Sequence, residues 1–202
     1  MTYSFVFSFI WSGCVTATDK YHEELSFHCR GLFEQIIYPG NDFIQNLYFD
    51  TGEVCFKHWN EKLPEFTYQK ELAFHSIIVE TIDTIRYSFV IKNLTDKLRP
   101  VIITGASGTG KSIQLSRVTH APLMLTSTTS HLMLQLSVES KLDKIRKNML
   151  GAAQGTVTVV AIDDTNMPAT DRYGAIPAVE VLRFMVDKKG IWDRKERFWK
   201  HI

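Results

Sequence analysis

The sequence predicts an α/β fold in which a parallel sheet is flanked by helices and is preceded by a mainly helical region. Three observations support this prediction. Runs rich in β-branched residues, at 101–104 and 156–162, alternate with helical patterns after residue 76. A glycine-rich loop lies between the first of these runs and the expected start of a helix. Before residue 60, the longest apolar pattern is helical.

The glycine-rich loop has the spacing of a phosphate-binding P-loop. Gly105 is followed by four residues and then by Gly110, Lys111 and Ser112. Glycines let the backbone approach phosphates closely, and the loop N–H groups together with a helix N-terminus bind the anion. Lys111 would bridge the β- and γ-phosphates, and Ser112 would ligate Mg²⁺. The residues predicted to bind the phosphates of ATP are Gly105, Ala106, Ser107, Gly108, Thr109, Gly110, Lys111 and Ser112.

Two acids follow the predicted strand 156–162. Asp163 and Asp164 stand at its end, and Asp163 comes 52 residues after Lys111. An apolar strand that ends in an acid at this distance from a P-loop is the Walker B arrangement. Asp163 is therefore predicted to hold Mg²⁺ through its water shell, and Asp164 to face the γ-phosphate at the position of a catalytic base. The alternative is a strand end with two solvated acids.

The other elements of the second half follow from hydrophobic periodicity and turn residues. Helices are expected at 81–97, 112–119, 131–148 and 174–188, and strands at 101–104, 123–126 and 156–162. Four basic residues of the 131–148 helix are interleaved with acids and are interpreted as a solvated face. These are Lys141, Lys144, Arg146 and Lys147.

The first half contains one clear helical pattern, at 20–37, which ends at a turn over 39–42. Residues 43–56 are predicted to form a hairpin around 50–52, and residues 57–80 a packed linker. The apolar run Tyr3–Ile10 is too short to span a bilayer and is interpreted as a buried helix or strand. Its abrupt start suggests that the chain begins within a larger fold.

The composition is that of an ordinary globular protein, with 45% hydrophobic and 22% charged residues in 202. A formal net charge of +1 gives no electrostatic reason to expect nucleic acid or membrane as a partner. Cys14, Cys29 and Cys55 are widely spaced, which favours a reduced, cytosolic-type compartment and predicts neither a disulfide framework nor a zinc site. His22 and His28, six residues apart, do not share a ligand face.

Several segments resemble the dynein heavy chain, and in particular the third AAA+ module of its motor ring. The segments that carry the resemblance are 77–112, Glu139–Lys144, Ile162–Pro168, Tyr173–Ala175, Glu180–Arg183 and Trp192–Lys195. The run Asp-Asp-Thr-Asn-Met-Pro at 163–168 is the most specific of them, and its Asp-Asp form is similar to axonemal dyneins. Phe5–Ser12 and the stretch from Trp59 to Phe66 look like the lid of the preceding, second module and its connector.

The resemblance implies a P-loop NTPase of the AAA+ class. Residues 1–75 would be the lid and connector, and residues 76–202 the large subdomain of an ATPase module, truncated at its C-terminal end. The site would be a regulatory ATP·Mg²⁺ site of a motor that moves toward microtubule minus ends. Such a motor would belong to the cytoskeleton of the cytoplasm, in particular to the axoneme of a cilium or flagellum. The implied partners are the other AAA+ modules of the same heavy chain, the dynein intermediate and light chains, and the microtubule through parts absent from this chain. By position, Ile78 and Val79 would lie on the adenine side.

Three departures from the family pattern predict slow hydrolysis. The helix after the P-loop is short, the chain stops before the strand that would carry the sensor-1 residue, and Asp164 stands where AAA+ proteins in general usually have Glu. An Asp carboxylate would lie about 1.5 Å farther from the attacking water, and misplacement on this scale costs on the order of a hundredfold in rate. The chain is therefore expected to bind ATP and to hydrolyse it slowly or not at all.

Two other functions remain open at this point. A P-loop phosphotransferase would fit the loop, but no Arg-rich lid follows Asp164. A scaffold or interaction fragment with an empty pocket would fit the short helix after the P-loop and the missing strand.

Overall fold

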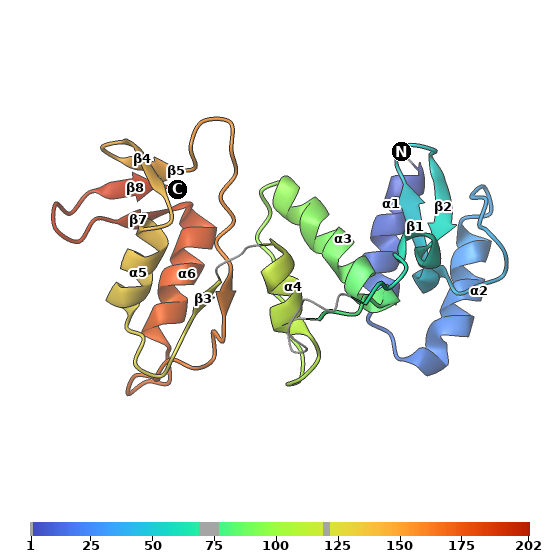
Figure 1. The fold of residues 1–202 in the computed structure, drawn as a ribbon, viewed down its shortest axis with the longest axis horizontal. Coiled ribbons are helices and arrows are strands. Elements are labelled where there is room, and N and C mark those ends of the chain that lie inside the picture. The colour runs from blue at the N-terminus through green and yellow to red at the C-terminus, as the bar shows by residue number, and fades with distance from the viewer. Residues whose placement is uncertain (1, 69–76, 119–121) are drawn as a thin grey trace. The chain divides into compact units, whose positions relative to one another are not determined.

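The computed structural model describes residues 2–68, 77–118 and 122–202 (Figure 1). The chain separates into two compact units, Met1–Tyr87 and Ser88–Ile202, and each unit is described by itself. The domain boundary predicted between residues 75 and 76 lies outside the described residues.

The first unit combines helices with one hairpin. Its helical elements are α1 (Thr2–Phe9), the π-helix η1 (Ile10–Cys14), the 3₁₀ turns η2 (Asp19–Tyr21), η3 (Ile44–Asn46) and η4 (Trp59–Lys62), and α2 (His22–Leu32). Its strands are β1 (Leu47–Asp50) and β2 (Cys55–His58), which pair antiparallel. The Asp50 carboxylate accepts hydrogen bonds from the backbone N–H groups of Gly52 at 2.8 Å and Glu53 at 3.3 Å, which stabilises the turn between the strands. The predicted hairpin is thereby confirmed.

The core of the first unit lies between α1, α2 and the hairpin. Val6, Ile10 and Cys14 follow one another at four-residue intervals and are all buried. They pack with buried residues of α2, of the segment after it and of the hairpin, namely Cys29, Ile36, Ile44, Leu47 and Phe56. The apolar run at the start of the chain is therefore a helix with one buried face, and the helical alternative of the prediction is confirmed.

Helix α2 is shorter than the predicted helix over 20–37. It ends at Leu32, because Phe33 leaves the helical region of backbone angles at φ −124° and ψ 53°. Phe33 then packs edge-on against Phe5 and Phe9 of α1, with ring centroids 6.2 and 5.6 Å apart. The first residue after α2 thus packs its side chain against α1.

Helix α3 (Ile82–Asp96) runs across the boundary between the two units and confirms the helix predicted at 81–97. The Thr81 hydroxyl accepts a hydrogen bond from the backbone N–H of Thr84 at 3.2 Å. Such a side-chain cap satisfies one of the free N–H groups of the first helical turn. At the other end, Leu98 adopts a left-handed conformation at φ 54°.

The second unit contains three further helices and two small sheets. The helices are α4 (Lys111–Val118), α5 (His131–Glu139) and α6 (Pro177–Lys188). The strands are β3 (Leu123–Met124), β4 (Asp143–Arg146), β5 (Met149–Gly151), β6 (Ile162–Asp163), β7 (Gly190–Trp192) and β8 (Trp199–His201). β3 and β6 form a parallel pair, and the other four strands form a sheet in the order β4-β5-β8-β7.

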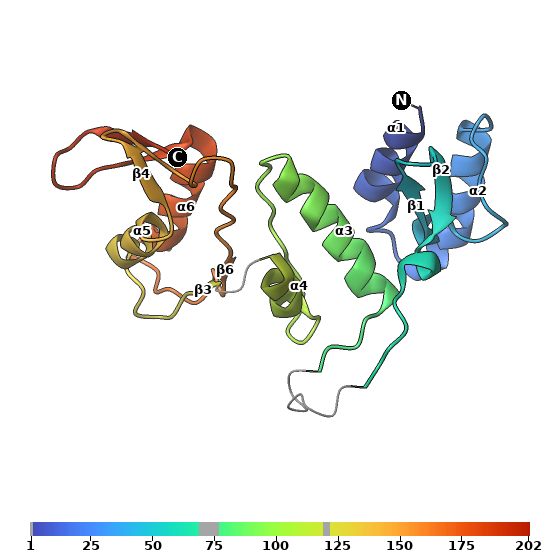
Figure 2. The same cartoon turned by 45° about the horizontal axis from the view of Figure 1, so that its top comes forward.

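The core of this unit lies where α5 and α6 pack on each other, side by side in Figures 1 and 2. Leu134 and Val138 of α5 and Ala178 of α6 are buried together with Leu125, which follows β3. Ile162 of β6 packs against this cluster. A parallel pair of strands flanked by helices is the arrangement that the sequence predicts, in a much smaller form.

Two predicted strands are mostly absent from the described residues. Residues 101–104 form no strand, and of the predicted run 156–162 only Ile162 is paired, with Leu123, while Asp163 just after the run pairs with Met124. The β-branched residues favour extended backbone, but a strand is stable only when a neighbour completes its hydrogen bonds. Within the described chain, β3 supplies two paired residues and 101–104 pairs with no strand.

The helix predicted at 131–148 is also wrong in its second half. Helix α5 ends at Glu139, and residues 143–151 form the β4–β5 hairpin. Met149 of this hairpin pairs in parallel with His201 of β8, so long-range pairing overrides the local helical pattern. The four basic residues noted above therefore do not share a helix face, although β4 is exposed along its whole length.

One charged cluster connects the β7–β8 hairpin to α5. The Lys200 ammonium lies 2.7 Å from Asp193 and 3.1 Å from Glu139, and all three side chains are largely shielded from solvent. Beside it, the Gln135 amide donates to Glu139 at 2.8 Å and to the Trp192 carbonyl at 2.9 Å. Residues almost sixty positions apart are thus held by a network in which each member has a partner.

Gly190 allows the two strands of this hairpin to meet. A Cβ atom at position 190 would lie 2.4 Å from the Lys200 carbonyl oxygen and 2.6 Å from the Trp199 ring. The Trp199 ring is itself enclosed by Phe184 and Trp192 in edge-to-face contacts. A Cβ atom at position 190 would therefore clash with a backbone oxygen as well as with a ring.

Of the helices that the structure describes, none has both the length and the apolar character needed to cross a membrane.

Gly190→Ala is therefore expected to destabilise the chain by about 1–3 kcal/mol through overpacking. Gly151→Ala is the matched control from the same sheet, because its Cβ would meet only the flexible end of Ile145. It should change the free energy of unfolding by less than about 1 kcal/mol. Urea denaturation followed by circular dichroism measures both, and equal effects of the two substitutions would contradict the steric argument.

A second prediction concerns acid stability. The hydrogen bond from Lys200, together with backbone N–H donors, lowers the pKa of Asp193 from 3.8 to about 2. Between these values the unfolded chain binds more protons than the folded one, so the free energy of unfolding falls as the pH decreases from about 4 to about 2. Asp193→Asn should remove this part of the pH dependence. Denaturation at pH 5 and pH 3 compares the two, and an unchanged difference between the pH values in the variant would contradict the assignment.

Candidate functional site

The P-loop lies between an extended segment and helix α4. Gly108 and Gly110 have φ angles of 80° and 82°, which L-residues with side chains rarely adopt. Helix α4 begins at Lys111, as the motif predicts, and the end predicted for it at residue 119 lies outside the described residues. The backbone N–H of Gln114 bonds to the Gly110 carbonyl at 3.2 Å and closes the first helical turn.

The lysine of the loop is bonded to the loop itself. Its ammonium donates to the carbonyl oxygens of Gly105 at 3.0 Å and Ala106 at 2.7 Å. The Thr109 hydroxyl also donates to the Ala106 carbonyl, at 2.9 Å. An ammonium group has three donors, so two are used within the loop, and a phosphate chain that takes more than the third would have to displace these carbonyls.

Helix α4 is joined to helix α3 by polar side chains. Within the second unit, the Ser88 hydroxyl of α3 donates to the Gln114 amide oxygen at 2.7 Å. Arg117, one turn further along α4, donates to the same hydroxyl at 3.3 Å. Gln114 is 6% exposed, so this contact fixes the buried face of α4 and leaves the loop at its N-terminus open to solvent.

The two acids of the predicted Walker B segment have different local settings. Asp163 is the last residue of β6, and its carboxylate accepts a hydrogen bond from the backbone N–H of Asp164 at 2.9 Å. Asp164 is exposed and left-handed at φ 55°. It starts a turn in which the Met167 N–H bonds to the Asp164 carbonyl at 3.0 Å. Asp163 retains a second carboxylate oxygen with which it could bind a hydrated cation.

A shared site for the P-loop and the two acids stays a prediction. Among the described residues, no hydrogen bond or ion pair joins residues 105–112 to Asp163 or Asp164. No cluster of three or more His, Cys, Asp or Glu side chains able to hold a metal is present in the described part of the chain. The chemistry of Ser112 and Asp163, a hydroxyl and a carboxylate, still fits Mg²⁺, which prefers oxygen ligands.

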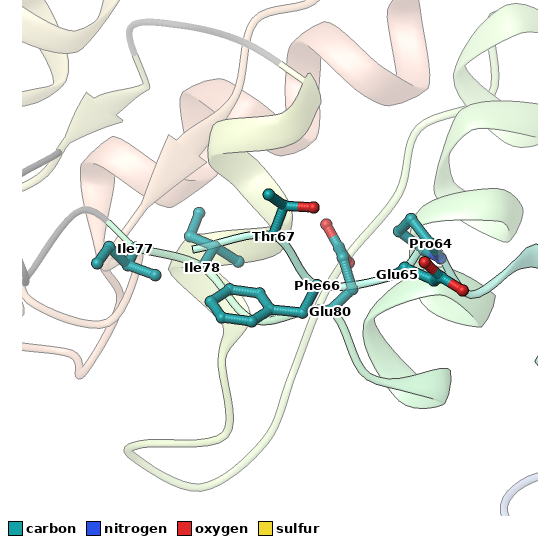
Figure 3. Close-up of a pocket in the computed structure, with 7 residues that line it drawn as sticks. All are labelled: Pro64, Glu65, Phe66, Thr67, Ile77, Ile78 and Glu80. Atoms are coloured by element: carbon teal, nitrogen blue, oxygen red, sulfur yellow. The ribbon is translucent and has the colours of Figure 1, made fainter. Parts of the chain in front are cut away.

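The adenine side was predicted at Ile78 and Val79, which belong to the first unit. Ile78 lines a pocket of about 200 Å³ in that unit, together with Phe66 and Glu80 (Figure 3). Val79 is exposed and is not among the lining residues. The sequence pattern did not single out Phe66 for this role, because an aromatic residue in a Pro-containing connector is equally typical of core packing. Since the P-loop belongs to the second unit, the adenine contacts stay a prediction.

Comparison with known proteins identifies both parts of the chain. Residues 1–61 match the family described as the dynein heavy chain AAA lid domain, and residues 66–202 match the P-loop containing dynein motor region. The match to the motor region covers the P-loop, Asp163 and Asp164. The match to the lid covers α1, α2 and the β1–β2 hairpin.

Individual relatives agree with these families. The chain is 32% identical to human dynein axonemal heavy chain 6 and 30% identical to mouse dynein axonemal heavy chain 2, over 98% of its own length in each case. It is 30% identical, over 76% of its length, to the Chlamydomonas reinhardtii dynein-1-alpha heavy chain of the flagellar inner arm I1 complex. It spans 5% of the length of the first two relatives and 4% of the third. With a lid sequence followed by a P-loop motor region, this chain belongs to the dynein heavy chain family.

Proposed function

We propose that this chain is an ATP-binding part of a dynein heavy chain, in which the P-loop holds the phosphates of ATP·Mg²⁺. The observation that carries the proposal is the geometry of the loop, where two left-handed glycines lead into a helix that begins at Lys111. In that geometry successive N–H groups converge on one point at the positive end of a helix dipole. Ser112 and Asp163 would supply oxygen ligands to the cation.

Within the whole motor, the site is proposed to regulate ATP-driven movement toward microtubule minus ends. The lid-then-motor order supports the assignment of residues 1–75 to the end of the second AAA+ module and of residues 76–202 to the third. The proposed partners are the neighbouring AAA+ modules and the dynein intermediate and light chains, with the microtubule bound by other parts of the heavy chain. The axonemal relatives support a place in the axoneme of a cilium or flagellum.

A second candidate function is that of an interaction element that binds no nucleotide. Two observations favour it. Lys111 is bonded to the carbonyls of its own loop, and the segment 101–104 that leads into the loop is not held in a sheet. Both features would raise the free energy needed to form a tight phosphate site. Nucleotide binding by the chain separates the two functions.

Equilibrium binding of a fluorescent ATP analogue with Mg²⁺ should give a micromolar Kd for this chain. Lys111→Ala should weaken binding tenfold or more, since a hydrogen bond to a charged group contributes about 1.5–3 kcal/mol. Lys92→Ala is the matched control, because Lys92 is an exposed lysine of α3 in the same unit. Absence of binding in the unmodified chain would favour the interaction element instead. Equal binding by the Lys111 variant would contradict the role proposed for the P-loop lysine.

Hydrolysis is expected to be slow and to depend little on Asp164. Asp164→Asn should change turnover by less than about threefold, because a short acid at this position is poorly placed to activate water. The substitution should leave the fold intact, since Asn tolerates a left-handed backbone as well as Asp does. Steady-state phosphate release, with the melting temperature of each variant as the folding control, tests this. Turnover near the enzyme median of about 10 s⁻¹ that is abolished by Asp164→Asn would contradict it.

A further inference from the structure

Two cysteines meet in the core of the first unit. Cys14 is the last residue of η1, and Cys29 lies in α2. Their sulfur atoms are 3.7 Å apart, and each residue is 3% exposed. Both are free thiols, so one S–H donates a weak hydrogen bond to the other sulfur. Two thiols in direct contact can be oxidised to a disulfide within the core, whereas a single buried cysteine has no second thiol to join.

The surroundings of the pair are apolar. Cys14 and Cys29 belong to the same buried cluster as Val6, Ile10 and Ile44. A disulfide has a sulfur–sulfur distance of about 2.05 Å, so the two atoms would have to approach by about 1.7 Å. The bond would also replace two S–H groups with an apolar linkage, which suits the apolar walls. Oxidation of the pair would therefore join two sulfur atoms that already lie side by side in an apolar core.

We propose that Cys14 and Cys29 form a modification site, a reversible disulfide made by exchange with a small-molecule disulfide of the glutathione type. One cysteine thiolate attacks a sulfur of oxidised glutathione, which forms a mixed disulfide and releases one glutathione thiolate. The second cysteine thiolate then attacks the protein sulfur of the mixed disulfide and releases the other glutathione. The protein pair loses two electrons and two protons, and oxidised glutathione gains them as two molecules of glutathione.

Burial slows the exchange but does not shift the thiol–disulfide equilibrium toward the thiols. Desolvation, with smaller contributions from the hydrogen bond and charge of Cys14, raises the pKa of Cys29 to about 12. The thiolate is the attacking species, so reaction in the closed core is rare and proceeds through transient opening. The equilibrium between thiols and disulfide does not depend on this rate. The same burial shields the finished disulfide from reductants.

The third cysteine provides an internal contrast. Cys55 lies on β2 and is partly exposed, and it has no cysteine partner within the described residues. It should form a mixed disulfide with glutathione and stop there. An intramolecular bond between Cys14 and Cys29 closes a loop of 15 residues that links η1 to α2. Such a cross-link restricts the unfolded chain and so stabilises the fold.

The test uses the full 202-residue chain carrying Cys55→Ser, incubated in glutathione buffers of graded redox ratio. Equilibrium is approached from both sides, from the reduced native chain and from chain refolded under oxidising conditions. After free thiols are blocked with iodoacetamide, mass spectrometry of proteolytic peptides should find the peptides of Cys14 and Cys29 joined. The melting midpoint of the oxidised chain should rise by about 5–10 °C.

The control is Cys29→Ala in the same background, in which Cys14 should end as a glutathione adduct. Peptide mapping of the two-cysteine chain reads the bond directly and does not depend on the stability of this control. The proposal is overturned if both cysteines stay free or end as glutathione adducts in the most oxidising buffer from either direction. It is equally overturned if the linked chain melts below the reduced one, since the core would then reject the bond.

Discussion

The second unit depends on one ammonium group. Lys200 binds Asp193 of its own hairpin and Glu139 of α5 at the same time, and the Gln135 amide completes the cluster between the helix and the Trp192 backbone. Removing one member would leave a shielded charge without its partner, which costs more than the net contribution of a paired charge. In the same hairpin, β8 pairs with β7 and with β5, so the cluster joins α5 to the four-stranded sheet.

The P-loop combines two features. Its backbone has the conformation typical of an anion site, and its lysine donates to carbonyls of the same loop. The left-handed glycines and the start of α4 already have the form that an anion requires, and the Ser88–Gln114 bond supports the helix from its buried side. Lys111, by contrast, is bonded to two carbonyls of the loop. Binding of a phosphate chain would exchange neutral acceptors for charged ones, and charge-assisted hydrogen bonds are the stronger kind. For the proposed function, this exchange would favour a ligand of high negative charge.

Local signals predicted the elements whose stability is local. The Thr81 cap, the Asp50 turn and the glycines before Lys111 act over a few residues, so α3, the β1–β2 hairpin and the start of α4 followed from the sequence. The β4–β5 hairpin did not, because its pairing with His201 joins residues about fifty positions apart. The same reason explains the errors at 101–104 and 156–161, where β-branched residues favour extended backbone but the described chain supplies no pairing strand.

In the candidate site, too, the features set by local sequence could be predicted and those set by long-range pairing could not. The residue types and the loop geometry around Gly108 and Gly110 could be predicted, because a motif of eight residues specifies them. The relation of that loop to Asp163 could not, since it depends on which strands pair across a sheet. In the described chain β6 pairs with β3, and the segment before the P-loop pairs with no strand.

The left-handed backbone of Asp164 also limits how the site can be redesigned. Glu in place of Asp164 would lengthen the side chain by one methylene group. Asp, Asn and Gly accept this backbone region readily, whereas Glu lacks the short side chain that bonds locally to the main chain. A longer acid here would thus require a rebuilt turn, because side-chain length and backbone conformation are coupled at this position.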